Sequence, residues 1–339
     1  MKTITRVAGT AIAVGLALST VTGCNSATKS TSSGSGSTKA GTIALLLPES
    51  KTTRYENFDK PYFEAAAKAA CADCKVIYSN ANQDAAMQKQ QAEAALTQGA
   101  KVIVLDSVDT QSGAGIAQEA KTQGAKVIAY DRFVEGADYY VSFDNEKVGE
   151  LQATTLIDQM KKAGKSSGNI VMINGSPTDS NAPVFKKGAH AVIDKSGYKV
   201  VAEYDTPDWS PDKAQAWMES QSNIAKSLVG VYVANDGMAG GVISALKGSG
   251  INPLPPVTGQ DAELAGVQRL VTGDQSMTIY KAIKPQATDA AKAAVALLNG
   301  KKPDAKTTFQ NVPATLLDPV AVTKANIKDT VVKDGFYTI

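Results

Sequence analysis

The sequence predicts an α/β fold with two domains, each a parallel sheet covered by helices on both faces. From Thr42 onward, short apolar runs rich in β-branched residues alternate with Ala-rich stretches whose apolar residues recur at helical spacing. This alternation is typical of buried parallel strands joined by helices. About 300 residues follow the start of the first run, which exceeds the size that a single hydrophobic core usually serves. Length and alternation together favour two α/β domains.

A first series of elements covers residues 42–143. The segments 99–104 and 124–129 nearly duplicate one another, and each begins with a Gly between the end of a helix and the start of a strand. Their similarity does not continue at a fixed period, so they indicate successive turns of one winding and not a repeat array. The predicted strands of this series are Thr42–Leu47, Lys75–Ser79, Lys101–Leu105, Lys126–Tyr130 and Tyr139–Phe143, and its clearest helices are Phe58–Ala70 and Asp84–Gln98.

A second series of βα units begins after residue 143 and holds more strands than the first domain can use. A helix near 285–299 and the segment Ala314–Leu317 follow it. A chain that returns to the first domain and ends in the second would join the two domains by several crossings. The predicted strands of the second series are 168–174, 198–205, 229–234, 256–260 and 276–280, and its predicted helices are 146–162, 181–194, 212–224, 237–248 and 262–272.

Residues 1–23 form a predicted secretory signal peptide. Lys2 and Arg6 precede an apolar run that is too short for a comfortable membrane span, and small residues follow it before Cys24. This ending resembles the lipobox of bacterial lipoproteins, in which Cys24 becomes the lipid-bearing first residue of the mature chain. A plain signal peptide that ends in Cys by chance would explain the same pattern. Residues 24–41 are then the lipidated Cys and a flexible polar tether with almost nothing to bury. The sequence therefore predicts an extracytoplasmic protein that is anchored to the cell membrane by lipid.

The composition argues against several kinds of partner. The chain carries 35 Lys and Arg against 33 Asp and Glu, and Lys2 and Arg6 leave with the signal, so the mature chain is balanced and nothing indicates nucleic-acid binding. Cys71 and Cys74 remain after lipidation. In an exported protein their spacing favours a local disulfide, whereas in the cytosol it could serve redox chemistry. A metal site needs more ligands than two Cys, and the only histidine, His190, lies far along the chain.

Polar residues gather where the predicted strands end. In open α/β sheets, ligands bind outside the carboxyl ends of the strands. Each residue alone has a simpler explanation, since Asp144, Asp236 and Asp261 precede helices and could serve as N-caps. Their concentration at one edge favours a binding site. The residues concerned are Glu49, Arg54, Asp106, Asp131, Arg132, Asp144, Asn145, Asn174, Trp209, Asn235, Asp236, Gln260, Asp261 and Lys281.

The chemistry of this set suits a neutral ligand with many hydroxyl groups. Carboxylates accept hydrogen bonds, Arg and Lys donate them and Asn does both, so together they can satisfy the hydroxyls of a sugar. The C–H face of a pyranose is apolar and can lie against an aromatic ring. Trp209, in the turn-rich loop Pro207–Pro211, and Tyr55 are the candidate platforms. Trp217 stands at helical spacing and is expected to serve packing.

Signals for catalysis are weak by comparison. The one Gly-x-Ser-x-Gly match, Gly164–Gly168, follows a predicted helix and precedes a predicted strand, which is the reverse of a nucleophile elbow. The chain has no complete Gly-x-x-x-x-Gly-Lys-Ser/Thr phosphate loop and no His-Glu-x-x-His helix. His190 falls in a predicted helix, where packing or solvation explains it. Paired carboxylates can hydrolyse a glycoside, but carboxylates set among Arg, Lys and Asn favour binding without turnover. We therefore expect no enzyme, no cofactor and no metal.

Several of these segments together resemble a known family. They are Ala129-Tyr130-Asp131-Arg132, Tyr140-Val141-Ser142-Phe143-Asp144-Asn145, Asn174-Gly175-Ser176-Pro177, Ala234-Asn235-Asp236, Gly259-Gln260-Asp261-Ala262 and Tyr280-Lys281. The chain resembles the D-xylose-binding proteins of bacterial ABC importers, a branch of the type I periplasmic sugar-binding proteins. The resemblance implies two Rossmann-like lobes joined by a three-segment hinge, with a monosaccharide in the cleft and delivery to an ABC permease and its ATPase.

The resemblance also implies lobe boundaries and contacts. The N-terminal lobe would be 42–143 plus 281–312, and the C-terminal lobe 144–280 plus 313–339. The implied ligand residues are Arg54, Tyr55, Asp131 and Arg132 from the first lobe, Asn145 at the first crossing, Asn181, Trp209, Asn235 and Asp261 from the second lobe, and Lys281 from the hinge.

The sequence also departs from this family's pattern. Tyr55 stands where the family has Trp, and the segments 48–53 and 106–108 differ as well. These departures leave open a hexose such as glucose in place of a pentose. Two further functions stay open as well, namely a sugar-sensing partner of a membrane signalling protein and an exported enzyme.

Overall fold

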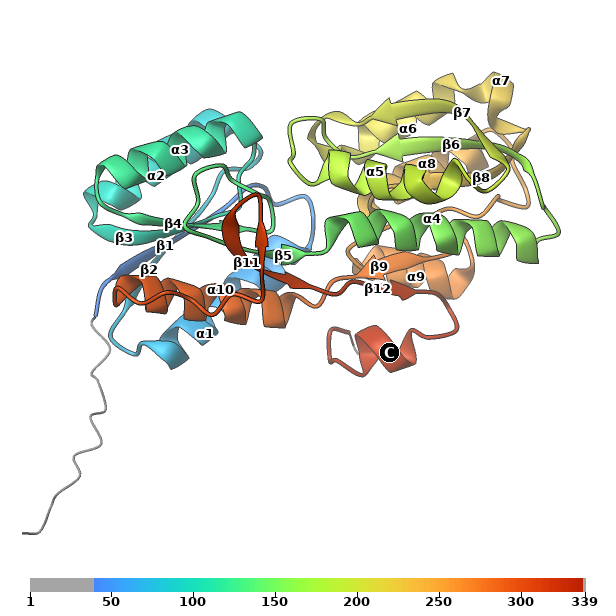
Figure 1. The fold of residues 1–339 in the computed structure, drawn as a ribbon. Coiled ribbons are helices and arrows are strands. Elements are labelled where there is room, and N and C mark those ends of the chain that lie inside the picture. The colour runs from blue at the N-terminus through green and yellow to red at the C-terminus, as the bar shows by residue number, and fades with distance from the viewer. Residues whose placement is uncertain (1–39, 338–339) are drawn as a thin grey trace, which may run out of the picture. The chain divides into compact units, whose positions relative to one another are not determined.

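The computed structural model describes residues 40–337 and contains two separate main sheets (Figure 1). The larger sheet has seven strands in the order β10-β11-β5-β4-β3-β1-β2, and all of its pairs are parallel except β10 with β11. The strands are β1 (Thr42–Leu47), β2 (Lys75–Asn80), β3 (Ala100–Leu105), β4 (Lys126–Tyr130), β5 (Tyr139–Phe143), β10 (Thr307–Phe309) and β11 (Val312–Leu317).

Helices cover both faces of this sheet because its strands are apolar on both sides. Along β1, Ile43 and Leu45 pack with α1 (Lys60–Ala70) and α10 (Ile283–Leu298). The intervening Ala44 and Leu46 face α2 (Ala85–Thr97) and α3 (Thr110–Thr122) on the other side. Figure 1 shows these two helical layers on either side of the sheet. The elements form the first lobe.

The second lobe is built on a smaller parallel sheet in the order β7-β6-β8. Helix α4 packs with α5, and α6 packs with α8, around a core that includes the buried strand residues Ile170–Ile173. A short antiparallel pair, β9 with β12, completes the lobe. The elements are β6 (Gly168–Asn174), β7 (Tyr198–Asp205), β8 (Leu228–Val233), β9 (Thr278–Tyr280), β12 (Val320–Val322), α4 (Asn145–Lys162), α5 (Ala182–Ile193), α6 (Pro211–Ser220), α7 (Ser222–Ala225), α8 (Asp236–Gly248) and α9 (Leu264–Thr272).

The chain crosses between the lobes three times, as the resemblance implies. The first crossing joins β5 to α4 at Asp144, and the second joins β9 to α10 at Lys281 and Ala282. The third joins β11 to β12 at Asp318 and Pro319 (Figure 1). The predicted change of lobe at residue 313 is wrong, because β11 pairs with β5 in the first sheet as far as Leu317.

Three predicted elements differ from the observed ones. The strand predicted at 256–260 is reduced to one bridge between Val257 and Val231. The Thr258 hydroxyl bonds both the N–H and the carbonyl of Val233, so these groups are not available to a longer ladder, and Pro256 has no N–H with which to extend it on the other side. The helix predicted at 212–224 is interrupted at Gln221. The helix predicted from Phe58 begins instead with a π-helical turn over Tyr55–Asp59.

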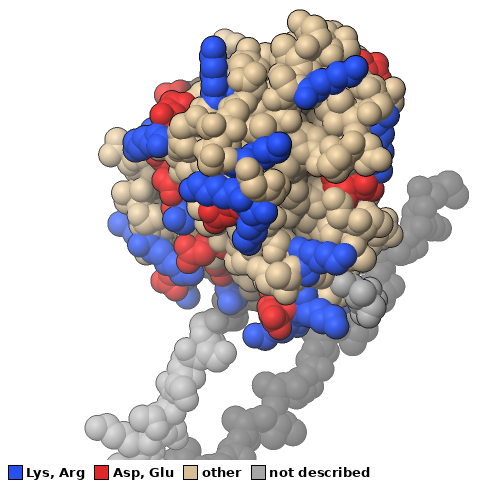
Figure 2. All heavy atoms as spheres, turned by 90° about the vertical axis from the view of Figure 1, so that its right-hand side faces the viewer, with Lys and Arg blue, Asp and Glu red and all other residues tan. Residues whose placement is uncertain are grey.

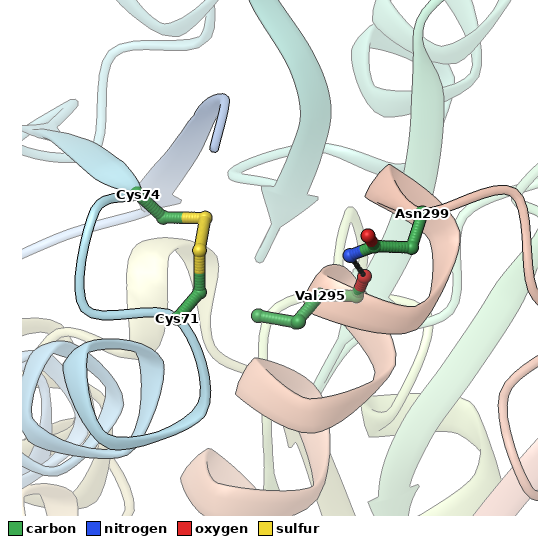
Figure 3. Close-up of a disulfide and its surroundings, with 4 residues drawn as sticks. All are labelled: Cys71, Cys74, Val295 and Asn299. Carbon is green, nitrogen blue, oxygen red and sulfur yellow. Dashed lines mark hydrogen bonds between the residues drawn. A yellow bond between two sulfur atoms is a disulfide. The ribbon is translucent and has the colours of Figure 1, made fainter. Parts of the chain in front are cut away.

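The predicted pairing of Cys71 with Cys74 is present as a disulfide. It closes the loop between α1 and β2 (Figure 3). The last turn of α10 lies beside it, where Asn299 Nδ2 donates to the Val295 carbonyl at 2.7 Å. The pair thus lies on the first lobe.

Charged side chains are interspersed on the face shown in Figure 2, and most of that face belongs to uncharged residues. Within residues 40–337, no helix combines the length and apolar character that crossing a membrane requires. The predicted signal peptide, Cys24 and most of the predicted tether lie outside the described residues.

Glycines allow α4 and α5 to approach closely. A methyl group at Gly149 would overlap the Phe185 carbonyl, and one at Gly188 would overlap the Glu146 carbonyl. We therefore expect Gly149→Ala to lower the free energy of unfolding by about 1–3 kcal/mol or more, because two backbones must separate. Chemical denaturation measures the change, and Gly115→Ala, a helical site with open space around it, is the control. Equal stability of the two variants would contradict this account of the helix contact.

Candidate functional site

A small polar cavity lies where the carboxyl ends of strands from both lobes meet. It contains nine of the ten ligand residues predicted from the sequence. Its lining residues are Thr52, Arg54, Tyr55, Asp131, Arg132, Asp179, Asn181, Phe185, Trp209, Asn235, Gln260, Asp261 and Lys281.

Arg54 is held rigidly by acceptors of the first lobe. Its Nε and Nη2 donate to the two oxygens of Asp59 at 2.9 and 2.8 Å, and Nη2 also donates to Gln286 Oε1 at 2.8 Å. Nη1 donates to Asp131 Oδ2 at 2.5 Å. Burial alone would raise the pKa of Asp131, but Arg54 and Lys281 outweigh it and lower that pKa. Asp131 Oδ1 is buried without a hydrogen-bond partner among the described residues, so an ionised acceptor is left for a donor in the cavity.

Arg132 joins the two lobes directly. Its Nε lies 2.8 Å from Asp179 Oδ2 of the second lobe, and its Nη1 donates to the Ser107 carbonyl of the first lobe at 2.8 Å. Its Nη2 lies 3.5 Å from the Tyr55 hydroxyl. Tyr55 is buried, with the Arg54 guanidinium over its ring at 5.3 Å from the centroid, and burial raises the pKa of its hydroxyl well above the usual range. Tyr55 therefore presents a neutral O–H to the cavity wall.

Trp209 follows β7 in the short 3-10 turn Pro207–Trp209. Asp208 and Trp209 have φ values of 59° and 53°, which are uncommon for residues with a side chain and typical of functional sites. The indole Nε1 donates to Asp179 Oδ2 at 2.9 Å, and the ring meets Phe185 edge-on at a centroid distance of 6.3 Å. The indole is thus fixed in orientation at the cavity. Trp217 stacks on Tyr204, as expected of a packing residue.

Gly175 makes room for this indole. A methyl group at residue 175 would overlap the far edge of the Trp209 ring system. We expect Gly175→Ala to displace the indole and to weaken ligand binding by about tenfold or more, since a stacked ring contributes about 0.5–1.5 kcal/mol besides its buried area. Titration calorimetry with D-xylose measures the loss. Gly248→Ala, where the added methyl meets open space, is the control, and unchanged affinity in Gly175→Ala would contradict the proposed role of the ring.

The second lobe and the hinge supply the other polar groups. Asn235 Oδ1 accepts from the Met238 N–H at the start of α8, so Asn235 is both a helix cap and a cavity residue. Asp261 Oδ1 lies 2.9 Å from Lys281 Nζ, and both side chains are less than a tenth exposed. Gln260 Oε1 is buried without a hydrogen-bond partner among the described residues.

Asn145 is the exception among the ten predicted residues. It does not line the cavity, and its Nδ2 donates to Oδ1 of the lining residue Asn181 at 2.9 Å. Asn181 Nδ2 in turn donates to the Asp131 carbonyl across the lobes at 3.2 Å. Asn145 therefore supports Asn181, and its predicted direct contact with a ligand is not supported by its position.

Some of the polar residues at strand ends have structural roles. Asp144 caps α4 through the Lys147 N–H, and Glu49 accepts from the Thr52 N–H in its own turn. Asp236 accepts from Thr278 and Gln275, and burial raises its pKa to about 7. For these residues the simpler interpretation of capping or buried structure holds.

The sequence prediction missed three lining residues, Thr52, Asp179 and Phe185, and noted Gln260 without including it in the site. Asp179 and Phe185 flank Asn181 in the loop after β6 and the start of α5. The nearby Asn181 could have pointed to Asp179, whereas Phe185 carries no signal that separates it from a core residue. In the described part of the chain, no group of three or more His, Cys, Asp or Glu is arranged to hold a metal ion.

Comparison with known proteins places the chain in a family. The model of the periplasmic binding protein domain matches residues 43–302. The D-xylose-binding periplasmic protein of Escherichia coli (strain K12) is 40% identical over 306 residues, which cover 87% of this chain and 90% of that protein. The multiple sugar-binding periplasmic receptor ChvE of Rhizobium radiobacter is 34% identical over 324 residues, covering 88% and 91%.

A solved structure agrees with these relatives. The ABC transporter solute binding protein from Clostridium phytofermentans with bound β-D-glucose superimposes with a TM-score of 0.80 at 29% identity, covering 88% of this chain and 98% of that one. The fold is therefore the two-lobed type I arrangement that the sequence predicts. Since the family model spans most of the described residues and the relatives match over most of their length, the chain belongs to the periplasmic binding protein family, whose members act outside the cytoplasm.

Proposed function

We propose that the protein is the sugar receptor of an ABC importer, and that it binds a monosaccharide, D-xylose first, between its lobes. The observation that carries the proposal is the pair of buried acceptors, Asp131 Oδ1 and Gln260 Oε1, beside a fixed indole in one cavity. Donating hydroxyls of a pyranose satisfy such acceptors, and its C–H face suits the ring of Trp209. The relatives in Escherichia coli and Haemophilus influenzae, both 40% identical, are D-xylose-binding proteins, which favours the pentose.

D-glucose is the second candidate. The similar structure from Clostridium phytofermentans contains β-D-glucose. The chain also has Tyr55 where the resemblance to the xylose branch expects Trp, and the smaller ring leaves space for a larger sugar. A hexose differs from a pentopyranose by one hydroxymethyl group, which needs that space and one more hydrogen-bond partner.

Titration calorimetry against a panel of sugars tests this proposal. The panel contains D-xylose, D-glucose, L-arabinose, D-ribose and myo-inositol, each titrated into the chain from residue 40 onward. Saturable 1:1 binding of D-xylose that is tighter than that of D-glucose supports the pentose, and the reverse order supports the hexose. Absence of binding by every sugar in the panel contradicts the proposed function.

We also propose that ligand binding closes the lobes and that the closed form is delivered to a permease and its ATPase. A ligand held by residues of both lobes enters when they part and is fully contacted when they close, so it shifts the population toward the closed form. Small-angle scattering is expected to give a smaller radius of gyration with saturating sugar than without. Tight binding with an unchanged curve would contradict closure.

The proposed anchor is a lipid on Cys24, and the proposed role is binding without turnover. When the full chain is expressed with a labelled fatty acid, the wild type is expected to carry the label and Cys24→Ala is not. Cys24→Ala is also expected to be absent from the membrane fraction. After long incubation, the sugar is expected to be recovered unchanged. Cleaved or oxidised sugar would favour the exported enzyme instead.

A further inference from the structure

Arg132 lies between two buried carboxylates that come from different lobes. Its Nε is 2.8 Å from Asp179 Oδ2 in the second lobe and 3.5 Å from Asp106 Oδ1 in its own lobe. The three side chains are 5%, 4% and 0% exposed. Asp179 is thus the nearer ion-pair partner of Arg132, and Asp106 is the more distant one.

The two carboxylates differ in how they are satisfied. Asp179 Oδ2 also accepts from Trp209 Nε1 at 2.9 Å, and Asp179 Oδ1 accepts from the Asn181 N–H at 2.8 Å. By contrast, neither oxygen of Asp106 has a hydrogen-bond donor among the described residues. Burial raises the pKa of Asp106 well above its usual range, although Arg132 acts against that shift. With the lobes in contact, Arg132 therefore pairs with Asp179, and an ionised Asp106 is unfavourable because it is buried without a hydrogen-bond donor.

Arg132 remains with the first lobe when the lobes part. Its Nη1 donates to the Ser107 carbonyl, one residue after Asp106, so this end of the guanidinium is tied to the loop that carries Asp106. Asp179 lies on the second lobe and must leave with it. When Asp179 leaves, Arg132 loses its nearest carboxylate, and Asp106 of its own lobe, 3.5 Å away, is the carboxylate that can replace it.

We propose that Arg132 exchanges partners during lobe motion, pairing with Asp179 when the lobes are closed and with Asp106 when they are open. Asp106 and Asp179 then compete for one guanidinium, and their balance sets the fraction of closed protein before any ligand binds. Because the closed form binds the ligand, that fraction scales the apparent affinity. Both carboxylates are positioning residues in this scheme, and its link to affinity rests on the proposed sugar-binding function.

The exchange predicts opposite effects for two isosteric changes. Asp179→Asn removes the closed-state partner and should weaken D-xylose binding by about tenfold or more, with a more open ligand-free protein. Asp106→Asn removes the open-state partner and the buried unpaired charge, and should tighten binding by about threefold or more, with a more closed ligand-free protein. A merely structural role would weaken binding in both variants.

The test combines ligand-free scattering with calorimetry on the chain from residue 40 onward. Scattering without sugar should give a larger radius of gyration for Asp179→Asn than for Asp106→Asn, with the wild type at or between them. Calorimetry with D-xylose and D-glucose should show tighter binding by Asp106→Asn than by Asp179→Asn. Asp274→Asn is the control, since Asp274 pairs with the half-exposed Lys247 and does not line the cavity, and both measurements should leave it at wild type.

Three outcomes overturn the proposal. Weaker binding by Asp106→Asn would make Asp106 a ligand contact or a structural residue. Ligand-free curves that coincide for all variants would show that the carboxylates do not bias the lobes. If circular dichroism shows that Asp179→Asn does not fold, Asp179→Glu takes its place. The exchange is then also overturned if both Asp179→Glu and Asp106→Asn have the scattering curve and the affinity of the wild type. Absence of sugar binding by the wild type would refute the proposed function alone, because the scattering comparison needs no ligand.

Discussion

Replacing Asp261 by Asn is expected to weaken D-xylose binding by about a hundredfold or more, because it breaks a buried ion pair at a cost of about 3–5 kcal/mol. Lys281 Nζ lies 2.9 Å from Asp261 Oδ1, and the two side chains are 4% and 8% exposed. The ammonium group also lies over the rings of Phe143 and Phe185, 5.8 Å from each centroid. With the lobes parted, water can reach Lys281, so the cost falls on the closed, ligand-bound form and appears as lost affinity.

Calorimetry of Asp261→Asn measures this loss, and thermal unfolding without sugar separates affinity from stability. Asp274→Asn is the matched control, because Asp274 pairs with the half-exposed Lys247 at 2.8 Å and neither residue lines the cavity. Exposed pairs contribute about 0–1 kcal/mol, so the control should bind as the wild type does. An Asp261→Asn protein that melts early and binds normally would make Asp261 a structural residue only.

Truncating Trp209 to Ala is expected to weaken D-xylose binding by at least about tenfold while the fold survives, since stacking contributes about 0.5–1.5 kcal/mol beyond the apolar area it buries. The change also removes the Nε1 donor to Asp179 Oδ2, the oxygen that lies 2.8 Å from Arg132 Nε of the opposite lobe. The loss therefore affects the platform and the contact between lobes together.

Trp217→Ala is the control for the truncation of Trp209. Trp217 packs on Tyr204 with a centroid distance of 5.4 Å and does not line the cavity, so its loss should lower stability and leave the dissociation constant unchanged. The chain has two tryptophans. In a Trp217→Phe background, Trp209 is the only indole, and its fluorescence should change on adding sugar. Unchanged affinity in a folded Trp209→Ala protein would place the ring outside the binding role.

Local sequence signals were sufficient for the fold class and for most of the cavity lining. Buried parallel strands must be apolar on both faces, so runs such as Thr42–Leu47 are visible without a structure. Parallel strands also end at one edge, which brings together polar residues that are far apart in the chain, such as Arg54, Asp131 and Asp261. Periodicity and strand ends are local properties, and they can therefore be recognised in a bare sequence.

Features that depend on the approach of distant segments required the folded structure. The strand predicted at 256–260 has the composition of a strand but forms only one bridge, because the Thr258 hydroxyl takes the N–H and the carbonyl of Val233 that a ladder would use. The true third crossing follows Leu317, since sheet partners, and not local pattern, assign β11 to the first lobe.

The roles of individual polar residues likewise depend on partners from other elements. Asn145 and Asp179 have similar local contexts near strand ends, yet Asn145 lies behind Asn181 while Asp179 reaches Arg132 and Trp209. An Asn or Asp can cap, support or contact a ligand, and the choice depends on which donors arrive from the other lobe. That information lies in the packing of the two lobes and not in any one stretch of sequence.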